Sequence, residues 1–216
     1  MSVKIISDRV TESRESGIFS IGPFSYFFKH LPIDLFRREL NGYKFLRHHY
    51  PVPDLLFSES QGDSGILIFS SEKSIGKERG LLVDLIASET REAETYSSLL
   101  SLFQSTFLRT LRKAQGRSSD VFFRNRIETR LAPLQMSSVI AQMETRSVSL
   151  NGLPIDFGGI RILLKDVARF FRRRRTSWCV ASQCDPNDLN LGLKPLILDF
   201  TAGGMNPLMA EFATFF

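Results

Sequence analysis

The first seventy residues contain several short apolar runs with the period of strands. Residues 3–10 alternate weakly and predict a strand, and the polar residues 11–17 predict a loop. The runs IFSI and FSYFFK flank a Gly-Pro turn and predict a hairpin that ends at Lys29. The beginning of the chain is therefore expected to be rich in strands.

A helix is expected next, because Pro32 and Asp34 are typical first-turn residues. Its apolar positions recur at i, i+4 and i+7, namely Phe36, Leu40 and Tyr43. Two more apolar runs, at 51–57 and 65–70, predict strands separated by the turn-rich SESQGDS. The segment thus reads as strand, hairpin, helix and two strands.

The chain after residue 71 has mostly helical patterns. Apolar positions between 82 and 111 fit a period of 3.6 residues, and 120–145 is expected to be helical around Pro133. An amphipathic helix is also expected around 163–171. We therefore place a domain boundary in the connector 70–76, with an N-terminal lobe at 1–71 and a helical lobe at 72–216.

Short strands are expected within this second part. The Asn-Gly pair in SVSLNGLPIDF predicts a hairpin over 147–157, and WCVAS predicts a strand over 178–182. The stretch after it reads as loop, strand, turn and strand, with an acidic residue at the last strand end.

Composition excludes several classes of protein. Of the 216 residues, 43% are hydrophobic and 24% charged, which excludes a disordered chain. No apolar run is long enough to span a bilayer and no signal peptide is recognised at the N-terminus, so we expect a cytoplasmic protein. Neither Cys179 and Cys184 nor the three histidines have the spacing of a metal site, so both cysteines are expected to be reduced and structural.

The positive charge is concentrated in one run. The formal net charge is +5, and Arg172–Arg175 form RRRR. Such a run is typical of a solvated helix end, where cations complement the helix dipole, and we favour this interpretation. A patch for nucleic acid or for an acidic substrate is the alternative. A nucleic-acid-binding function would leave the acidic residues near the C-terminus unexplained.

Those acidic residues have the spacing of a phosphoryl-transfer site. Asp185 begins an Asp-x-x-x-x-Asn pattern that ends at Asn190, and an apolar run leads into Asp199. One carboxylate of such a set can accept the proton of an attacking hydroxyl, while a second carboxylate and an amide oxygen hold Mg²⁺ against phosphate oxygens. The pattern predicts Asp185 as the base and Asn190 and Asp199 as metal ligands.

A lysine that braces the other phosphates is expected at Lys29. Glu39 lies on or beside the apolar face of its helix, where a carboxylate is costly without a cation, although an exposed Glu39 fits the spacing equally well. Lys29 is the nearest candidate partner. The order Lys, Glu, Asp, Asn, Asp along the chain is that of kinases.

The stretches CDPNDLN and LILDFTAGGMNPLMAEFATFF resemble the aminoglycoside phosphotransferase and choline kinase-like branch of the protein-kinase-like fold. Those enzymes carry a His-Gly-Asp-x-x-x-x-Asn loop, and then an apolar strand that ends in the metal-binding Asp. The resemblance is specific over 178–214. Over 18–76 it rests on Lys29, Glu39 and the order of elements, and over 77–177 it is only topological.

The resemblance implies an α+β, two-lobed protein-kinase-like fold with a β-rich N-lobe, a mostly helical C-lobe and ATP in the cleft. The backbone near Ser70, Ser71 and Glu72 would contact the adenine. With Mg²⁺, Asp185, Asn190 and Asp199 in the roles given above, the γ-phosphate of ATP would pass to a hydroxyl of a small molecule. No nucleic acid or membrane partner is expected.

The chain departs from the family pattern in three places. Gln183 and Cys184 replace the His and Gly of the loop, and the 11–17 segment is poor in Gly, although Ser13 and Ser16 could donate to phosphate. The chain also stops at EFATFF, where family members continue through further helices. We expect a truncated reading frame or a partner that covers this apolar end. A pseudokinase or interaction module without turnover is the alternative function.

Overall fold

The structure is a computed structural model, and it describes part of the chain. The described residues are 3–11, 14–70, 81, 82, 86, 93–115, 141, 142, 144, 145, 148–160, 162, 166, 169, 176–184, 190–192, 196–209 and 211. The chain divides into two compact units, Met1–Leu111 with Val180–Phe216, and Arg112–Cys179, which we describe separately. The lobe boundary expected at 71 and 72 lies at the edge of 71–80, outside the described residues, and stays a prediction.

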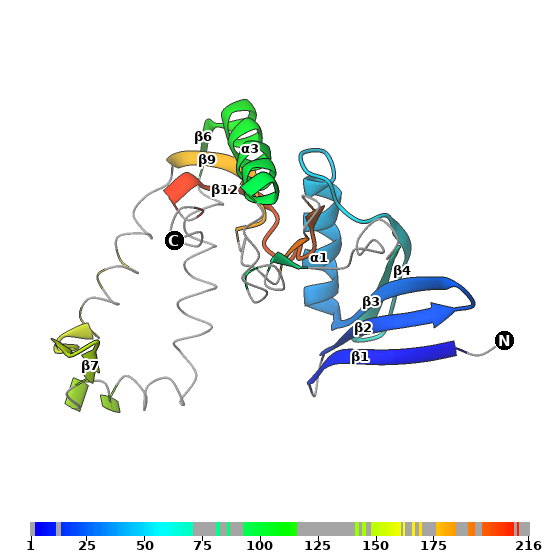
Figure 1. Ribbon diagram of the computed structural model, residues 1–216, viewed down its shortest axis with the longest axis horizontal. Helices are drawn as coiled ribbons and strands as arrows, with labels where there is room; N and C mark the ends of the chain where they lie inside the picture. The colour runs from blue at the N-terminus through cyan, green and yellow to red at the C-terminus, as the bar shows by residue number, and fades with distance from the viewer. Residues whose placement is uncertain are drawn as a thin grey trace. The chain divides into compact units, whose positions relative to one another are not determined.

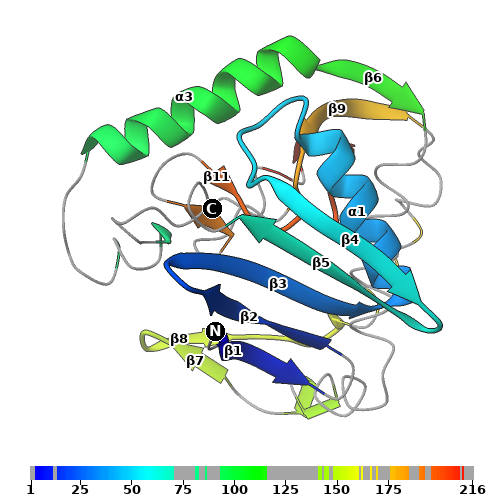
Figure 2. The ribbon, with the colours of Figure 1, turned by 90° about the vertical axis from the view of Figure 1, so that its right-hand side faces the viewer.

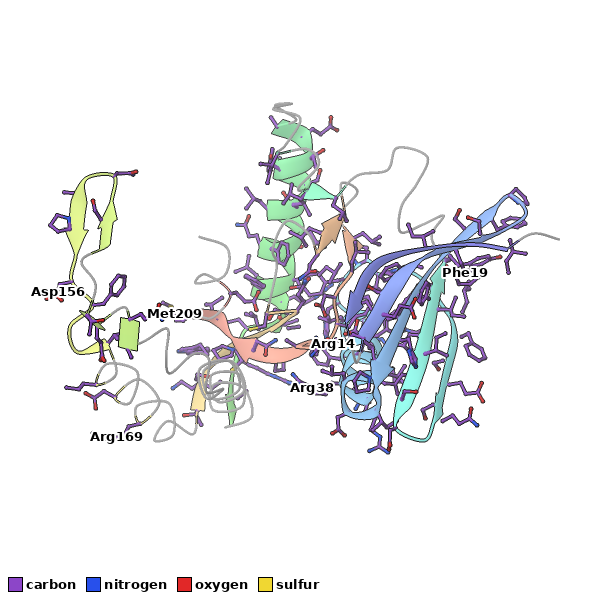
Figure 3. The ribbon with its side chains drawn as sticks, turned by 90° about the horizontal axis from the view of Figure 1, so that it is seen from below. Arg14, Phe19, Arg38, Asp156, Arg169 and Met209 are labelled. Carbon is purple, nitrogen blue, oxygen red and sulfur yellow. The ribbon has the colours of Figure 1, made fainter. Side chains whose placement is uncertain are left out.

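A five-stranded antiparallel sheet dominates the first unit (Figures 1 and 2). Its strands, in spatial order, are β1 (Val3–Thr11), β2 (Arg14–Ile21), β3 (Phe24–Pro32), β5 (Ser64–Ser70) and β4 (Leu55–Gln61). The expected Gly-Pro turn joins β2 to β3, and Gly22 has the positive φ that such a turn requires. Figure 3 shows Arg14 and Phe19 towards opposite ends of β2, and Phe19 stacks on Tyr26 of β3 with ring centroids 5.1 Å apart.

The prediction of a loop over 11–17 is wrong for most of these residues. Thr11 pairs with Arg14, Val10 with Glu15 and Arg9 with Ser16, so β2 already begins at Arg14. A ladder of backbone hydrogen bonds forms regardless of side-chain polarity where one side of a strand is accessible to water. The connection between β1 and β2 shortens to residues 12 and 13, which lie outside the described residues.

The two strands expected at 51–57 and 65–70 are present with shifted bounds. The first begins only at Leu55, because Pro51 and Pro53 have no N–H to donate to a ladder. It then runs through polar residues to Gln61, since β4 is an edge strand and most of its side chains are exposed. The polar run that predicts a loop therefore forms the solvated edge of the sheet.

Helix α1 (Ile33–Leu46) follows β3 directly, with Pro32 as its N-cap residue and Asp34 in its first turn. Its apolar face packs on the sheet and on the segment around Phe200. The buried core that results contains Leu31, Phe36, Tyr43, Leu46, Leu67, Phe69 and Phe200. The helical period of the sequence thus predicted the buried face of α1 correctly at Phe36 and Tyr43.

Two glycines allow α1 to approach the chain after Asp199 closely. A Cβ atom on Gly42 would lie 1.7 Å from the carbonyl oxygen of Phe200, and one on Gly203 would lie 3.0 Å from the Cα of Gly42. A side chain at either position would therefore push the segment 200–203 away from the helix.

The remaining described elements of this unit are helix α3 (Ala93–Thr110), the two-residue strands β10 (Leu191–Gly192) and β11 (Leu196–Ile197), strand β12 (Gly204–Pro207) and the end of β9 (Thr176–Ser182). The Tyr50 hydroxyl donates to the carbonyl of Ala181 at 2.7 Å, and the N–H of Ala181 donates to Thr110 Oγ1 at 2.9 Å. These bonds fix the end of β9 beside α3. Within the described residues, no helix combines the length and the apolar character needed to cross a bilayer.

The second unit contains the expected Asn-Gly hairpin. Strands β7 (Val148–Leu150) and β8 (Leu153–Ile155) pair around Asn151 and Gly152, both at positive φ. Asp156, labelled in Figure 3, follows this hairpin and accepts a hydrogen bond from the N–H of Gly158. Strand β6 (Arg112–Gln115), which the sequence pattern did not predict, pairs with β9. Most of the helices expected at 120–145 and 163–171, and all of Arg172–Arg175, lie outside the described residues.

The close approach of α1 predicts an unusual response to Gly42→Ala. In an open helix this change is stabilising by about 1 kcal/mol, but here the methyl group meets the carbonyl of Phe200, and overpacking should lower the free energy of unfolding by about 1–3 kcal/mol. Urea denaturation measures the difference. Asn41→Ala, at an exposed neighbouring position in α1, is the matched control and should be neutral or stabilising. A more stable Gly42→Ala protein would contradict the close contact.

Candidate functional site

Lys29 lies on the face of the sheet that α1 covers. It is the cross-strand partner of Ser16 on β2 and of Leu67 on β5, so the three side chains share one face. Its Nζ forms an ion pair with Glu39 and donates to the carbonyl of Leu198 at 3.1 Å. Lys29 is 14% exposed and therefore remains accessible at one side. The contact that the sequence suggested between Lys29 and Glu39 is present.

Glu39 is buried, with 1% of its side chain exposed, and not an exposed residue of a mixed helix. Its Oε1 accepts from Lys29 and from the backbone N–H of Phe200 at 3.3 Å, and its Oε2 accepts from the hydroxyl of Thr201. Three donors from two other segments thus satisfy one carboxylate on α1. A buried carboxylate needs such partners.

The hairpin of β10 and β11 brings Asn190 close to Asp199. Leu191 pairs with Ile197, and just outside this pair the N–H of Leu198 donates to the carbonyl of Asn190 at 3.1 Å. Leu198 therefore links both sides of the site, because its carbonyl accepts from Lys29. Residues that stand apart in the sequence, Asn190 and Asp199, become neighbours through this short ladder.

Asp199 lies next to the positive charge of Lys29. Burial alone would raise the pKa of Asp199. The positive charge of Lys29 and the N–H of Thr201 outweigh the effect of burial, so the pKa is lowered. The N–H of Thr201 donates to Oδ1 of Asp199 at 3.0 Å. The pKa of Glu39 is raised by burial, with Lys29 opposing and Asp199 adding to the rise. Of the two carboxylates, Asp199 is thus the one whose ionised form the surroundings favour, as a metal ligand requires.

The loop that precedes Asp185 has an unusual backbone at Cys184. Its φ is 60°, in the left-handed region where a residue with a Cβ atom is disfavoured by about 1–2 kcal/mol. This is the position at which the resembling family carries Gly. Gln183 and Cys184 are both buried, and no disulfide joins Cys184 to Cys179.

A buried polar cluster lies directly before this loop. The hydroxyl of Ser182 donates to Glu211, and the amide of Asn206 donates to the carbonyl of Ser182 at 2.9 Å and to that of Ala202 at 3.0 Å. Sequence reasoning assigned no role to these residues or to Thr201. The only signal available for Thr201 was its place directly after Asp199 and Phe200.

The predicted site residues divide into two sets. Lys29, Glu39, Asn190 and Asp199 are described and lie in one neighbourhood of the first unit, which also contains Ser16. The base Asp185 lies outside the described residues, as do Ser13, Ser71 and Glu72, and their roles stay predictions. Among the residues that the structure describes, no three His, Cys, Asp or Glu side chains form a cluster that could hold a metal.

Among the comparisons with known proteins, the solved structures indicate the fold. No protein-family model matches the chain, and no curated protein matches it by sequence. Solved structures do match. A thermostable mutant of aminoglycoside phosphotransferase APH(4)-Ia, in ternary complex with ADP and hygromycin B, is similar at a TM-score of 0.57 with 12% identity, covering 99% of this chain and 72% of that one. The apo form is similar at a TM-score of 0.56 with 13% identity, covering 98% and 72%.

The fold of this chain is therefore that of the aminoglycoside phosphotransferases, as the resemblance of its motifs implied. The β-rich N-terminal part with one main helix is confirmed. The described residues of the remainder include α3 as a long helix, and the expected helical character of the whole C-terminal lobe stays a prediction.

The ion pair predicts a pH-dependent effect of Lys29→Met. The free energy of unfolding should fall by about 3–5 kcal/mol near neutral pH, because a buried carboxylate loses its counter-charge. Without Lys29 the pKa of Glu39 moves further above its unfolded value. The loss should therefore be small below the unfolded pKa and grow as the pH rises through the folded pKa. Urea denaturation at acidic and at mildly alkaline pH measures the difference.

Lys44→Met is the matched control, since Lys44 is exposed in the last turn of the same helix. Its effect should be small at both pH values. An equal loss of stability at both pH values in Lys29→Met would contradict a coupling to the buried carboxylates.

Proposed function

We propose that the chain is an ATP- and Mg²⁺-dependent phosphotransferase that transfers the γ-phosphate to a hydroxyl group of a small molecule. The observation that carries the proposal is the arrangement of Lys29 between Glu39 and the segment that ends in Asp199. Similar folds in solved structures hold ADP or AMP-PNP together with hygromycin B, which supports a nucleotide and a small hydroxyl-bearing acceptor as the class of ligands.

Each residue would have a separate task. Lys29 would hold phosphate oxygens of the nucleotide through its Nζ, and Glu39 would keep that Nζ in place. Ser16, on the same face as Lys29, could donate its hydroxyl to phosphate. The backbone around Ser71 would contact the adenine.

The acceptor side of the reaction would depend on Asp185. Its carboxylate would orient the acceptor hydroxyl and take its proton as the new bond to phosphorus forms. The buried cluster of Ser182, Asn206 and Glu211 would hold the end of β9 from which this loop departs.

The chemistry of Asp199 and Asn190 fits Mg²⁺. Mg²⁺ prefers oxygen ligands and is commonly held by one or two carboxylates together with phosphate oxygens and water. Asp199 supplies a carboxylate whose ionised form is favoured. The backbone of Asn190 is bonded to Leu198, next to Asp199, and its side-chain amide oxygen would be the second protein ligand. When bound, the ion would offset the negative charge that develops on the transferred phosphate.

Thermal unfolding with MgATP tests the nucleotide site. The wild-type chain should be stabilised by ATP only when Mg²⁺ is present, because binding to the native state shifts unfolding by mass action. At a ligand concentration about a hundredfold above Kd the shift corresponds to about 2.7 kcal/mol. Asp199→Ala should lose the Mg²⁺-dependent part of this shift.

The matched control is Asp63→Ala, an exposed aspartate in the turn between β4 and β5. It should keep the full shift. A wild-type chain that unfolds cooperatively but shows no shift with MgATP would exclude the proposed site, and a shift that persists in Asp199→Ala would remove Asp199 from it.

A pseudokinase is the second candidate function, and one observation favours it. Gln183 stands where the resembling family has His, two residues before the proposed base, and its neighbour Cys184 occupies a left-handed backbone position. The test is a panel of acceptors that contains aminoglycosides, choline and amino alcohols. MgATP binding without phosphate transfer to any of them would favour the pseudokinase. Transfer that falls by orders of magnitude in Asp185→Asn, with nucleotide affinity retained, would favour the enzyme.

A further inference from the structure

Thr201 is bonded to both carboxylates of the candidate site. Its hydroxyl donates to Oε2 of Glu39, and its backbone N–H donates to Oδ1 of Asp199 at 3.0 Å. The two carboxylates belong to segments more than a hundred residues apart, α1 and the chain after β11. One residue therefore connects the residue that holds Lys29 to the proposed metal ligand.

The two hydrogen bonds of Thr201 have different effects. The N–H of Thr201 orients Asp199 locally, as an aspartate often accepts from the backbone two residues on. The hydroxyl then anchors this turn to a helix, because Glu39 is buried and its Oε1 is already occupied by Lys29 and the N–H of Phe200. Without the hydroxyl, Oε2 would lose this donor and the turn would lose its side-chain link to α1.

Steric contact holds the same segment against α1. Gly42 allows the carbonyl of Phe200 to reach the helix, and Gly203 packs against Leu46. The hydroxyl of Thr201 lies between these two contacts in the sequence and supplies the directional bond that packing alone lacks.

We propose that Thr201 is a positioning residue for Asp199. The hydroxyl of Thr201 binds Glu39 and so holds Thr201 in place, and the N–H of Thr201 then orients the metal-binding carboxylate of Asp199. This rests on the proposed function, which it deepens. Partners that orient a metal ligand without touching the metal commonly change metal affinity by about 10–100-fold when they are removed. Removal of the hydroxyl should therefore lower the affinity for Mg²⁺ more than the affinity for the nucleotide.

The test is a Mg²⁺ titration of thermal stabilisation at a fixed, saturating concentration of ATP. Thr201→Val keeps the shape and removes the hydroxyl, and it should need about tenfold more Mg²⁺ for half-maximal stabilisation. Thr201→Ser keeps a hydroxyl and should stay close to the wild type. If the valine variant does not fold, the Ser and Ala variants at this position differ by one oxygen atom and give the same comparison.

Thr106→Val is the matched control. Thr106 is buried in α3, and its hydroxyl donates to the carbonyl of His49 at 3.4 Å, away from the candidate site. The variant should lose stability without any change in the Mg²⁺ midpoint, which separates a structural role from a positioning role.

The outcomes distinguish the two proposals. A wild-type Mg²⁺ midpoint in Thr201→Val, or in Thr201→Ala, would overturn the positioning role and leave the phosphotransferase proposal intact. Equal weakening in the Ser and Ala variants would overturn it as well, since the hydroxyl would then be irrelevant. A wild-type chain without Mg²⁺-dependent stabilisation would overturn the proposed function, and the role of Thr201 with it.

Discussion

The buried carboxylate of Glu39 is the constraint on which the candidate site depends. A carboxylate removed from water destabilises the fold unless donors satisfy it, and here the donors come from β3 and from the segment 200–201. Each donor must be in place at once, because a missing one leaves a buried charge incompletely compensated. The free-energy cost of leaving Glu39 without a donor therefore disfavours a displaced Lys29 and a displaced turn after Asp199 alike. Stability and geometry of the site have the same origin.

This electrostatic constraint works only because the backbones come close together. Glu39 reaches the N–H of Phe200 from a helix whose next turn carries Gly42, where a Cβ atom would overlap the carbonyl of Phe200. A larger residue there would move the segment outward and lengthen the bonds to Glu39. Gly42 is therefore part of the site in a physical sense, although it has no functional group.

The sequence predicted the parts of this arrangement that depend on local pattern and residue chemistry. Phe36 and Tyr43 marked the buried face of α1. Glu39 lay on or beside that face, and its spacing fitted a buried residue with a cationic partner and an exposed residue equally well. Lys29 was the nearest candidate partner along the chain, and the structure contains this ion pair. By contrast, Thr201 and Gly42 act through contacts between segments that are distant along the chain. The spacing and periodicity of residues within one segment do not predict such contacts. The strand at 14–17 was missed for a related reason, since its pairing with β1 does not depend on apolar side chains.

The loop before Asp185 has a backbone conformation that glycine adopts readily, although this chain has Cys184 there. Cys184 has a φ of 60°, where a side chain is disfavoured by about 1–2 kcal/mol relative to glycine. A strained conformation persists only where the surroundings enforce it, and the cluster of Ser182, Asn206 and Glu211 lies directly beside it. The cysteine at this position is therefore weak evidence against activity. Gln183, which stands where the resembling family has His, is the other departure in this loop, and phosphate transfer itself distinguishes an enzyme from a pseudokinase.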